Sequence, residues 1–187
     1  STDGTREYLK ALSKDNFKII YHEYNQGKGA SIRNALRFVE GDYVIIQDAD
    51  LEYQPQEYVK LLETALKHNS SVVFGSRFLK GGFKKFTPLQ YIANRILTNF
   101  INLLYGVRLT DVETCYKLFH RDVIKSFNIE SRGFDVEIEL VSKVLKRKIK
   151  IVEIPIEYKG RKYHEGKKIR AKDGLISLIK IFLYRIK

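Results

Sequence analysis

Short, mainly apolar runs alternate with helix-like stretches along the first half of the chain, and this alternation constrains the fold most. The runs lie at 17–21 (FKIIY), 43–46 (YVII) and 71–75 (SVVFG). Runs of this kind are typical of strands that are buried on both faces of a sheet. Apolar residues recur at helical spacing over 5–13, 30–39 and 55–67. The order helix, strand, helix, strand predicts an α/β domain with a largely parallel sheet, which a further strand before residue 1 would complete.

The second half of the chain predicts three more helices and one strand. Helical spacing covers 87–105 and 134–148, a strand-like run covers 149–158, and an apolar segment covers 175–186. Pro155 inside the strand-like run indicates an edge strand or a bulge. No run reaches the roughly 20 apolar residues that span a bilayer. With 187 residues, the chain is expected to form a single domain, 1–187.

The charges alternate in blocks along the chain, although the net charge is +12. Residues 64–110 carry 7 basic and no acidic side chains, and residues 141–187 carry 15 basic and 4 acidic ones. The blocks 1–63 and 111–140 are net acidic. The acidic blocks are suited to a metal ion and the basic blocks to an anionic ligand or a membrane, with a solvated lysine-rich surface as the alternative.

Two carboxylates follow the second apolar run, in Asp48-Ala49-Asp50. Ligands of open α/β sheets bind outside the carboxyl ends of the strands. Both carboxylates there can reach one hard cation, and Glu52 could add a third oxygen. Mg²⁺ prefers such a site, completed by substrate phosphates. We therefore expect a metal site formed by Asp48, Asp50 and Glu52, with a solvated loop as the alternative.

Two further segments lie where an anion could bind. The turn Gly27-Lys28-Gly29 stands between a strand-like run and a helix, so it could present backbone N–H groups to an anion, although a plain tight turn is the more frequent outcome. Arg77 follows the third strand-like run and is suited either to a phosphate or to a structural salt bridge. The single cysteine and the histidines show no spacing typical of a metal site or of a nucleophilic triad.

Residues 83–106 form a candidate membrane-interface region. Lys84 and Lys85 precede a wide apolar stripe that runs from Leu89 to Leu104. Such a stripe is typical of an ordinary core helix and also of an amphipathic helix that lies on a membrane surface. Both interpretations remain open from the sequence.

Taken in order, several segments resemble the family 2 glycosyltransferases of the dolichyl- or polyprenyl-phosphate mannosyltransferase type. They are STDGT, NQGKGASIRNAL, GDYVIIQDADLEY, VVFGSRF, ANRILTNFINLLYG, LTDVETCYKLF, EIPIEYKGR and EGKKI. The resemblance implies a GT-A fold and inverting transfer of a hexose from a nucleotide sugar, GDP-mannose or UDP-glucose, to a polyprenyl or dolichyl phosphate. The alternative with the same fold is a different glycan or lipid acceptor. It also implies Mg²⁺ or Mn²⁺ as cofactor and a peripheral location at the cytoplasmic face of a membrane.

The resemblance assigns roles to individual residues. Asp50 and Arg77 are expected to be catalytic, and Asp48, Asp50 and Glu52 to meet the metal. The expected substrate-binding set is Asp48, Ala49, Asp50, Arg77, Arg161 and Lys167. Asp111, Glu113 and Lys117 fall in an acceptor-side motif without an assigned role.

The resemblance also shows a departure, and one alternative of another class remains. The family carries strands and a nucleobase-binding segment ahead of STDGT, so the first strands are expected to be missing. The alternative is a basic nucleic-acid-binding module, which predicts aromatic residues interleaved with basic ones on one face. Tyr158 and Tyr163 give this alternative slight support, but the carboxylates at the strand end count against it, so we expect no nucleic acid partner.

Overall fold

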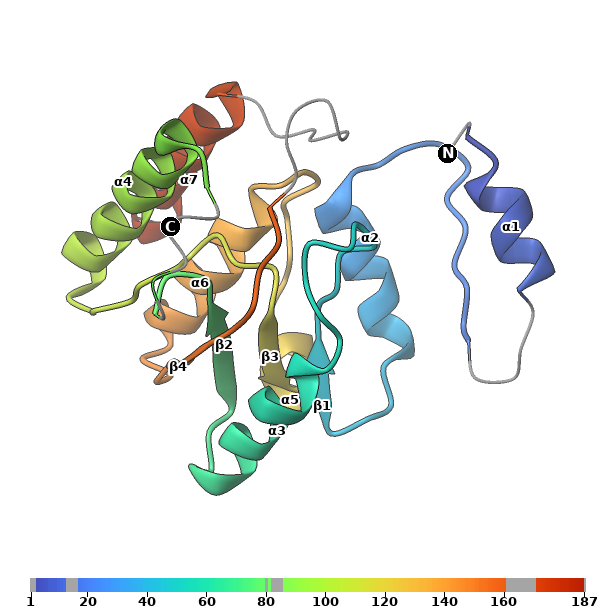
Figure 1. The fold of residues 1–187 in the computed structure, drawn as a ribbon, viewed down its shortest axis with the longest axis horizontal. Helices are drawn as coiled ribbons and strands as arrows, with labels where there is room; N and C mark the ends of the chain where they lie inside the picture. Colours follow the sequence, from blue (N-terminus) through green and yellow to red (C-terminus); the bar gives the residue numbers. More distant parts are fainter. Residues whose placement is uncertain (1–2, 13–16, 80, 82–85, 161–170, 187) are drawn as a thin grey trace.

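A mixed four-stranded sheet with helices packed around it forms the body of the molecule (Figure 1). The computed structural model describes residues 3–12, 17–79, 81, 86–160 and 171–186. The strands are β1 (Tyr43–Ile45), β2 (Val72–Ser76), β3 (Lys117–His120) and β4 (Val152–Pro155). Their order across the sheet is β1-β3-β2-β4. The expected α/β class is thereby confirmed.

Three strands share one direction and the fourth opposes them. β3 lies between β1 and β2 and is antiparallel to both, whereas β2 and β4 are parallel. As expected, β1, β2 and β4 run in the same direction. Only β2 and β4 pair in parallel, however, because the antiparallel β3 separates β1 from β2. Helix–strand alternation fixes the direction of strands that helical crossovers join, but it does not show which strand lies between them. Pro155 lies in β4, which pairs only with β2 among the described strands and is an edge, as predicted.

The helices follow the predicted stretches, except α5, which no predicted stretch covers. They are α1 (Thr5–Ala11), α2 (Lys28–Ala35), the 3₁₀ turn η1 (Leu36–Phe38), α3 (Glu57–Lys67), α4 (Pro88–Tyr105), α5 (Arg121–Lys125), α6 (Val136–Lys146) and α7 (Ala171–Ile186). Helices α4, α6 and α7 pack against one another, and α3 packs on β2 (Figure 1). The ends of α4 have local causes: Thr87 forms a capping box ahead of Pro88, and Gly106 ends the helix at a φ of 67°.

The core lies between the sheet and these helices. β2 is buried along its whole length, including Phe74, which meets Phe119 of β3 edge to face. Ile101 of α4, Ile138 of α6 and Ile181 of α7 are fully buried. The final apolar segment is thus a helix whose inner side belongs to the core.

The predicted strand at 17–21 is wrong. This segment has no regular secondary structure and pairs with no described strand, and Phe17 remains 57% exposed. It stands with α1 apart from the body, at the right of Figure 1, and α1 itself buries no residue. An apolar run becomes a strand only where a neighbour accepts its backbone hydrogen bonds, and the described sheet ends at β1.

The apolar stripe of α4 divides into two sides. Leu97 and Ile101 are buried in the core, whereas Ile92 and Ile96 are about half exposed and Leu89 is more exposed still. The helix predicted at 87–105 is therefore confirmed, and only part of its stripe serves the core. None of the helices in the described part of the chain combines the length and the apolar content that a bilayer span requires.

Two glycines allow the start of α2 to contact the loop before α6. The Gly29 N–H donates to the carbonyl of Arg132 at 2.8 Å. A Cβ on Gly29 would stand 2.3 Å from the Ser131 carbonyl oxygen, and one on Gly27, at a φ of 88°, would stand 2.2 Å from that of Arg132. Only residues without a side chain permit this approach of two backbones.

We expect Gly29→Ala to destabilise the protein by about 1–3 kcal/mol or more, because the new methyl group would overlap a backbone oxygen. Gly174→Ala is the matched control, since nothing lies within 4 Å of its added Cβ in α7. That control is expected to be neutral or to gain up to about 1 kcal/mol, as helical alanine does. Urea unfolding of both variants measures the difference, and equal midpoints would contradict the packing described.

Candidate functional site

The loop that follows β1 presents two aspartates. Ile46 is buried, whereas the Asp48 and Asp50 side chains are partly exposed and Ala49 is exposed. Oδ1 of Asp50 accepts a hydrogen bond from the Glu52 N–H at 3.1 Å. Leu51, between them, has a φ of 60°. A leucine in the left-handed region is strained, and such strain is typical of loops that the surroundings hold for function.

Side chains on both sides hold this loop. Oε1 of Gln47 accepts hydrogen bonds from the hydroxyls of Tyr58 at 2.7 Å and Tyr116 at 2.5 Å. On the other side, the Tyr158 hydroxyl donates to Oε2 of Glu52 at 3.1 Å. The two aspartates therefore stand between two anchored residues.

The predicted metal triad is not arranged as a triad. Glu52 is 8% exposed and its carboxylate is engaged with Tyr158. In the described ranges no three His, Cys, Asp or Glu side chains are close enough to hold a metal ion. Asp48 and Asp50 are the carboxylates that solvent reaches, and they fit a divalent cation that takes one or two carboxylates and fills its other positions with water and phosphate oxygens.

Lys28 contacts the first of these aspartates. Its Nζ lies 2.8 Å from Oδ2 of Asp48 and 2.7 Å from Oε1 of Glu137. Burial opposes its charge, but Glu137 and Asp48 raise the pKa of Lys28. The N–H groups of Gly27 and Gly29 donate to Asn25 and Arg132. The turn 27–29 is thus a packed turn, and these two N–H groups do not form the anion cradle that was the other interpretation.

Glu137 forms the centre of a buried ion cluster. Its second oxygen pairs with Lys117 of β3, which is fully buried and also donates to the carbonyl of Thr114. Burial alone would raise the pKa of Glu137, but the ammonium groups of Lys117 and Lys28 lower it. Lys117 of the acceptor-side motif is therefore joined through Glu137 and Lys28 to Asp48.

Arg77 leaves the end of β2 and pairs with Asp111. Its Nε lies 2.7 Å from Oδ2 and its Nη2 lies 2.8 Å from Oδ1 of Asp111, a bidentate pair, and Nη2 also donates to Asn94 of α4 at 3.1 Å. The guanidinium carbon stands 5.2 Å from the ring centres of both Phe86 and Tyr158. The salt-bridge interpretation of Arg77 is thus observed, and only 8% of the residue is exposed.

Glu153 of β4 fixes the turn that carries Asp111. Its oxygens accept from the Thr110 N–H at 2.8 Å and from the Asp111 N–H at 3.1 Å. Burial raises the pKa of Glu153, against these hydrogen bonds. Thr110 also shares a 2.6 Å hydrogen bond with Ser76, the residue before Arg77. Residues of β2 and β4 therefore hold the backbone at 110 and 111, where the segment with Asp111, Glu113 and Lys117 begins.

Glu113 is the buried carboxyl of this motif that lacks a hydrogen-bond partner at Oε1 within the described ranges. The pKa of Glu113 is raised to about 7. Burial is the largest cause, and the nearby Lys117 opposes part of the rise. Glu137, Arg77 and Asp111 also act on it. The carboxyl consequently changes charge near neutral pH.

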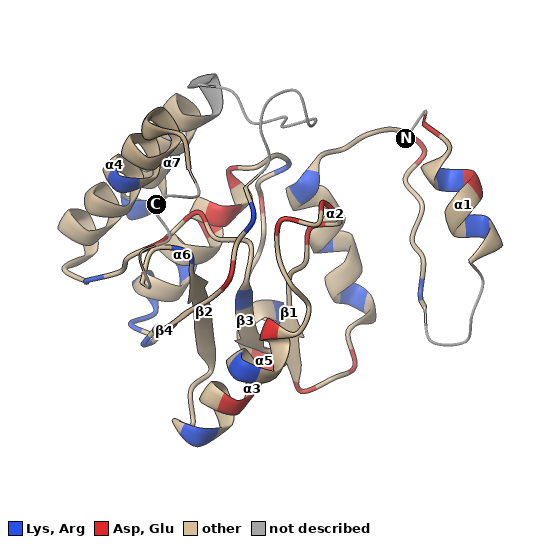
Figure 2. Cartoon of the chain, in the orientation of Figure 1, with Lys and Arg blue, Asp and Glu red and all other residues tan. Residues whose placement is uncertain are grey.

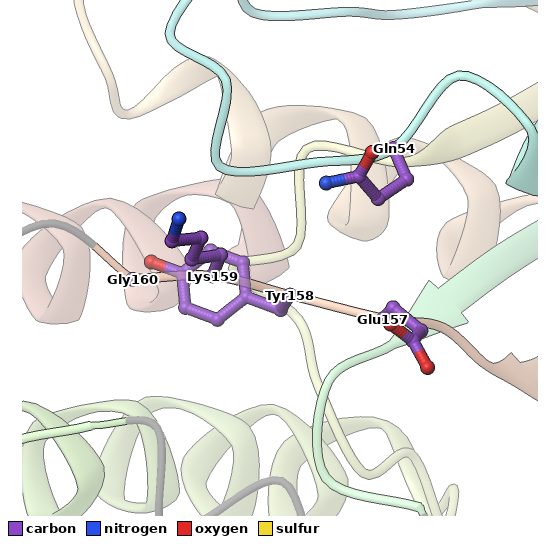
Figure 3. A pocket seen from close by; sticks show the side chains of 5 residues that line it. All are labelled: Gln54, Glu157, Tyr158, Lys159 and Gly160. Carbon is purple, nitrogen blue, oxygen red and sulfur yellow. The ribbon is translucent and has the colours of Figure 1, made fainter.

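A cavity of about 390 Å³ opens between the segment around Gln54 and the segment that follows β4 (Figure 3). Its walls are Gln54, Glu157, Tyr158, Lys159 and Gly160. Gln54 comes from the segment after the aspartates, and the other four come from the segment after β4. The Lys159 N–H donates to the Glu52 carbonyl at 2.8 Å, which joins the two walls.

The structure places the predicted residues in two groups. Asp48, Ala49 and Asp50 are on the exposed loop, and Arg77 and Asp111 form the buried pair. Arg161 and Lys167 lie outside the described residues. Tyr158 is 4% exposed and bonded to Glu52, so it offers no stacking face to a nucleic acid.

Three interacting residues were missed from the sequence. They are Lys28 as an ammonium partner, Glu137 and Glu153. For Glu137 a signal was present, because it falls on the apolar side of the predicted helix 134–148 with Leu140 and Val144. A carboxylate on an apolar face indicates a buried pair.

Comparison with known proteins finds a family model that matches most of this chain. The model of the family described as "Glycosyl transferase family 2" matches residues 1–127. The low-salt glycan biosynthesis hexosyltransferase Agl6 of Haloferax volcanii is 30% identical, over 86% of this chain and 38% of that protein. The dolichyl-phosphate beta-glucosyltransferase of Saccharomyces cerevisiae is 27% identical, over 84% of this chain and 54% of that protein. The chain thus spans about half or less of the length of these relatives.

One more relative and one solved structure extend the comparison. The undecaprenyl-phosphate mannosyltransferase of Micrococcus luteus is 25% identical, over 89% of this chain and 72% of that protein. The glucosyl-3-phosphoglycerate synthase of Mycobacterium tuberculosis, solved with Mn²⁺, UDP-glucose and phosphoglyceric acid, gives a TM-score of 0.63 over the whole of this chain and 64% of that one. At 18% identity this likeness shows the fold, and the expected GT-A architecture is confirmed.

We expect Glu113→Gln to gain stability relative to the parent protein as the pH rises. Because the pKa of Glu113 is raised from 4.5 to about 7, the folded state holds a proton that the unfolded chain releases between those values. The stability of the parent therefore falls across this window, and the variant lacks that fall. Urea unfolding at about pH 5 and about pH 8 measures the difference. The exposed Glu40→Gln is the control, and the same pH trend in both variants would contradict the assignment.

Proposed function

The chain belongs to glycosyl transferase family 2, and we propose that it transfers a hexose, with inversion, from a nucleotide sugar to a polyprenyl phosphate. Two relatives are named dolichyl-phosphate beta-glucosyltransferase and undecaprenyl-phosphate mannosyltransferase, and both names join a hexose to a polyprenyl phosphate. The donors to be tested are GDP-mannose, the first choice from the resemblance, and UDP-glucose.

The observation that carries this proposal is the partly exposed pair Asp48 and Asp50, just after the carboxyl end of β1. The two aspartates stand on an anchored loop that solvent reaches, and Gln54, which follows this loop, lines the cavity of about 390 Å³. In this proposal they hold Mg²⁺ or Mn²⁺, and the cation supplies charge neutralisation for a departing nucleoside diphosphate. Glu52, bonded to Tyr158, keeps the loop in place.

The acceptor chemistry needs little from the protein beyond positioning. A polyprenyl phosphate is anionic at neutral pH, so its oxygen can attack the sugar without a general base. We assign Arg77, Arg161 and Lys167 to the phosphates. Arg77 is held by Asp111 and stacks on Tyr158, which lines the cavity. A phosphate would meet a guanidinium whose orientation is already fixed, which lowers the entropy cost of binding.

A lipid acceptor requires contact with a membrane surface, and helices α4 and α7 supply an apolar face for it. Figure 2 shows both helices with few charges along their described lengths. Their exposed apolar side chains include Leu89, Ile92, Ile96, Leu103, Leu175, Ile179, Phe182 and Ile186. In this proposal the face lies in the headgroup region of a cytoplasmic leaflet, and nearby basic residues contribute about 1 kcal/mol each when the lipids are anionic.

We expect Asp50→Ala in the full chain to reduce sugar transfer by roughly 100-fold or more, because a charge-neutralising group is lost where the leaving group departs. Transfer of radiolabelled sugar to a polyprenyl phosphate in the presence of Mn²⁺ measures it. Asp42→Ala is the control, since Asp42 is highly exposed at the start of β1. Undiminished transfer by the Asp50 variant would remove this residue from the site.

We expect the double substitution Ile92→Glu and Ile96→Glu to weaken binding to anionic vesicles by about tenfold or more, because two apolar side chains would no longer enter the lipid. Vesicle sedimentation at low and high salt measures this binding. Val59→Glu with Leu66→Glu, two similarly exposed apolar residues of α3, is the matched control. Equal losses in both pairs, or none in the first, would place the membrane contact elsewhere.

A further inference from the structure

Four charged side chains form a continuous row from the aspartate loop into the core. In order they are Asp48, Lys28, Glu137 and Lys117. The signs alternate, so the row is neutral as a whole. Exposure falls along it, from 32% for the Asp48 side chain to 14% for Lys28, 5% for Glu137 and none for Lys117. The row joins four separate parts of the chain.

Lys28 is held at Asp48 by more than that one contact. Its Nζ is shared between Asp48 and Glu137, at 2.8 and 2.7 Å. The start of α2 is tied to the loop before α6 by the Gly29–Arg132 hydrogen bond of 2.8 Å. If Lys28 withdrew, Glu137 would keep a single cationic partner while buried, which is costly. The ammonium is therefore a fixed charge and not a mobile surface lysine.

A fixed ammonium beside Asp48 opposes a second cation at the same carboxylate. Lys28 cancels about one unit of the negative charge that Asp48 would otherwise present to a cation. The ammonium also occupies Oδ2 of Asp48. A divalent ion that arrives alone must share Asp48 with this charge, whereas an ion that arrives with a diphosphate brings its own negative charge.

We propose that Lys28 is a positioning residue that weakens the binding of a divalent cation alone and so makes metal binding depend on a nucleoside diphosphate. This inference rests on the proposed metal site at Asp48. Glu137 and Lys117 serve it by holding the ammonium in place. The consequence is that cation and donor occupy the site together, and that the empty protein retains little metal.

The test is a Mn²⁺ titration of the full chain without nucleotide, followed by electron paramagnetic resonance of free Mn²⁺. Lys28→Met should bind Mn²⁺ roughly tenfold more tightly than the parent, because a unit positive charge leaves the site. Added GDP or UDP should then increase Mn²⁺ affinity less in Lys28→Met than in the parent. Lys60→Met is the matched control, since Lys60 also pairs with a glutamate, but on α3.

Asp48→Asn distinguishes a failure of the proposed metal site from a failure of the proposed role of Lys28. Mn²⁺ binding that survives this change would overturn the proposed metal site itself. If Asp48→Asn abolishes binding but Lys28→Met binds Mn²⁺ as the parent does, or more weakly, the metal site stands and the role of Lys28 is wrong. Lys28→Gln repeats the test with a polar side chain. Failure of both neutral variants to fold would make Lys28 a structural ion-pair partner and would also overturn the inference.

Discussion

The arrangement of the site depends on the ion pairs that the buried carboxylate of Glu137 forms with two lysines. Glu137 lies near the start of α6 and pairs with Lys28 of α2 and Lys117 of β3. Removing one partner of a buried ion pair costs about 3–5 kcal/mol, although replacing the whole set by apolar residues is often neutral. Stability alone therefore does not explain these charges. Their effect is to fix two ammonium groups, one of them at Asp48, in a single geometry.

A second buried pair does the same for the other half of the site. Asp111 holds the Arg77 guanidinium with both oxygens, and Glu153 holds the backbone of residues 110 and 111. Arg77 and Asp111 face each other's opposite charge, and Glu153 faces backbone donors, as burial requires. The partly exposed aspartate loop thus lies near buried polar residues that hydrogen bonds and ion pairs hold in place. Buried residues with fixed partners, next to a loop that solvent reaches, suit a site that must accept a charged ligand without rearranging.

The sequence was informative where the pattern is local and silent where partners are distant. Strand β2, helix α4 and the position of Asp48 and Asp50 after a strand follow from periodicity and from turn residues. The antiparallel insertion of β3 and the unpaired segment 17–21 depend on which strands meet, which local patterns do not encode. The same holds for Glu52. Its place near the two aspartates in the sequence predicted that it binds the metal. Its carboxylate instead accepts a hydrogen bond from Tyr158, 106 positions away.

Tyr158 also joins the two halves of the site. Its hydroxyl donates to Glu52, whose N–H donates to Asp50, and its ring lies 5.2 Å from the Arg77 guanidinium carbon. A continuous set of contacts therefore runs from the Asp111–Arg77 pair to the aspartate loop. Leu51 at a φ of 60° is strained by about 1–3 kcal/mol, and the contacts on either side of it hold that conformation. These contacts link Arg77, which we propose to meet the phosphates, to Asp50, which we propose to meet the cation.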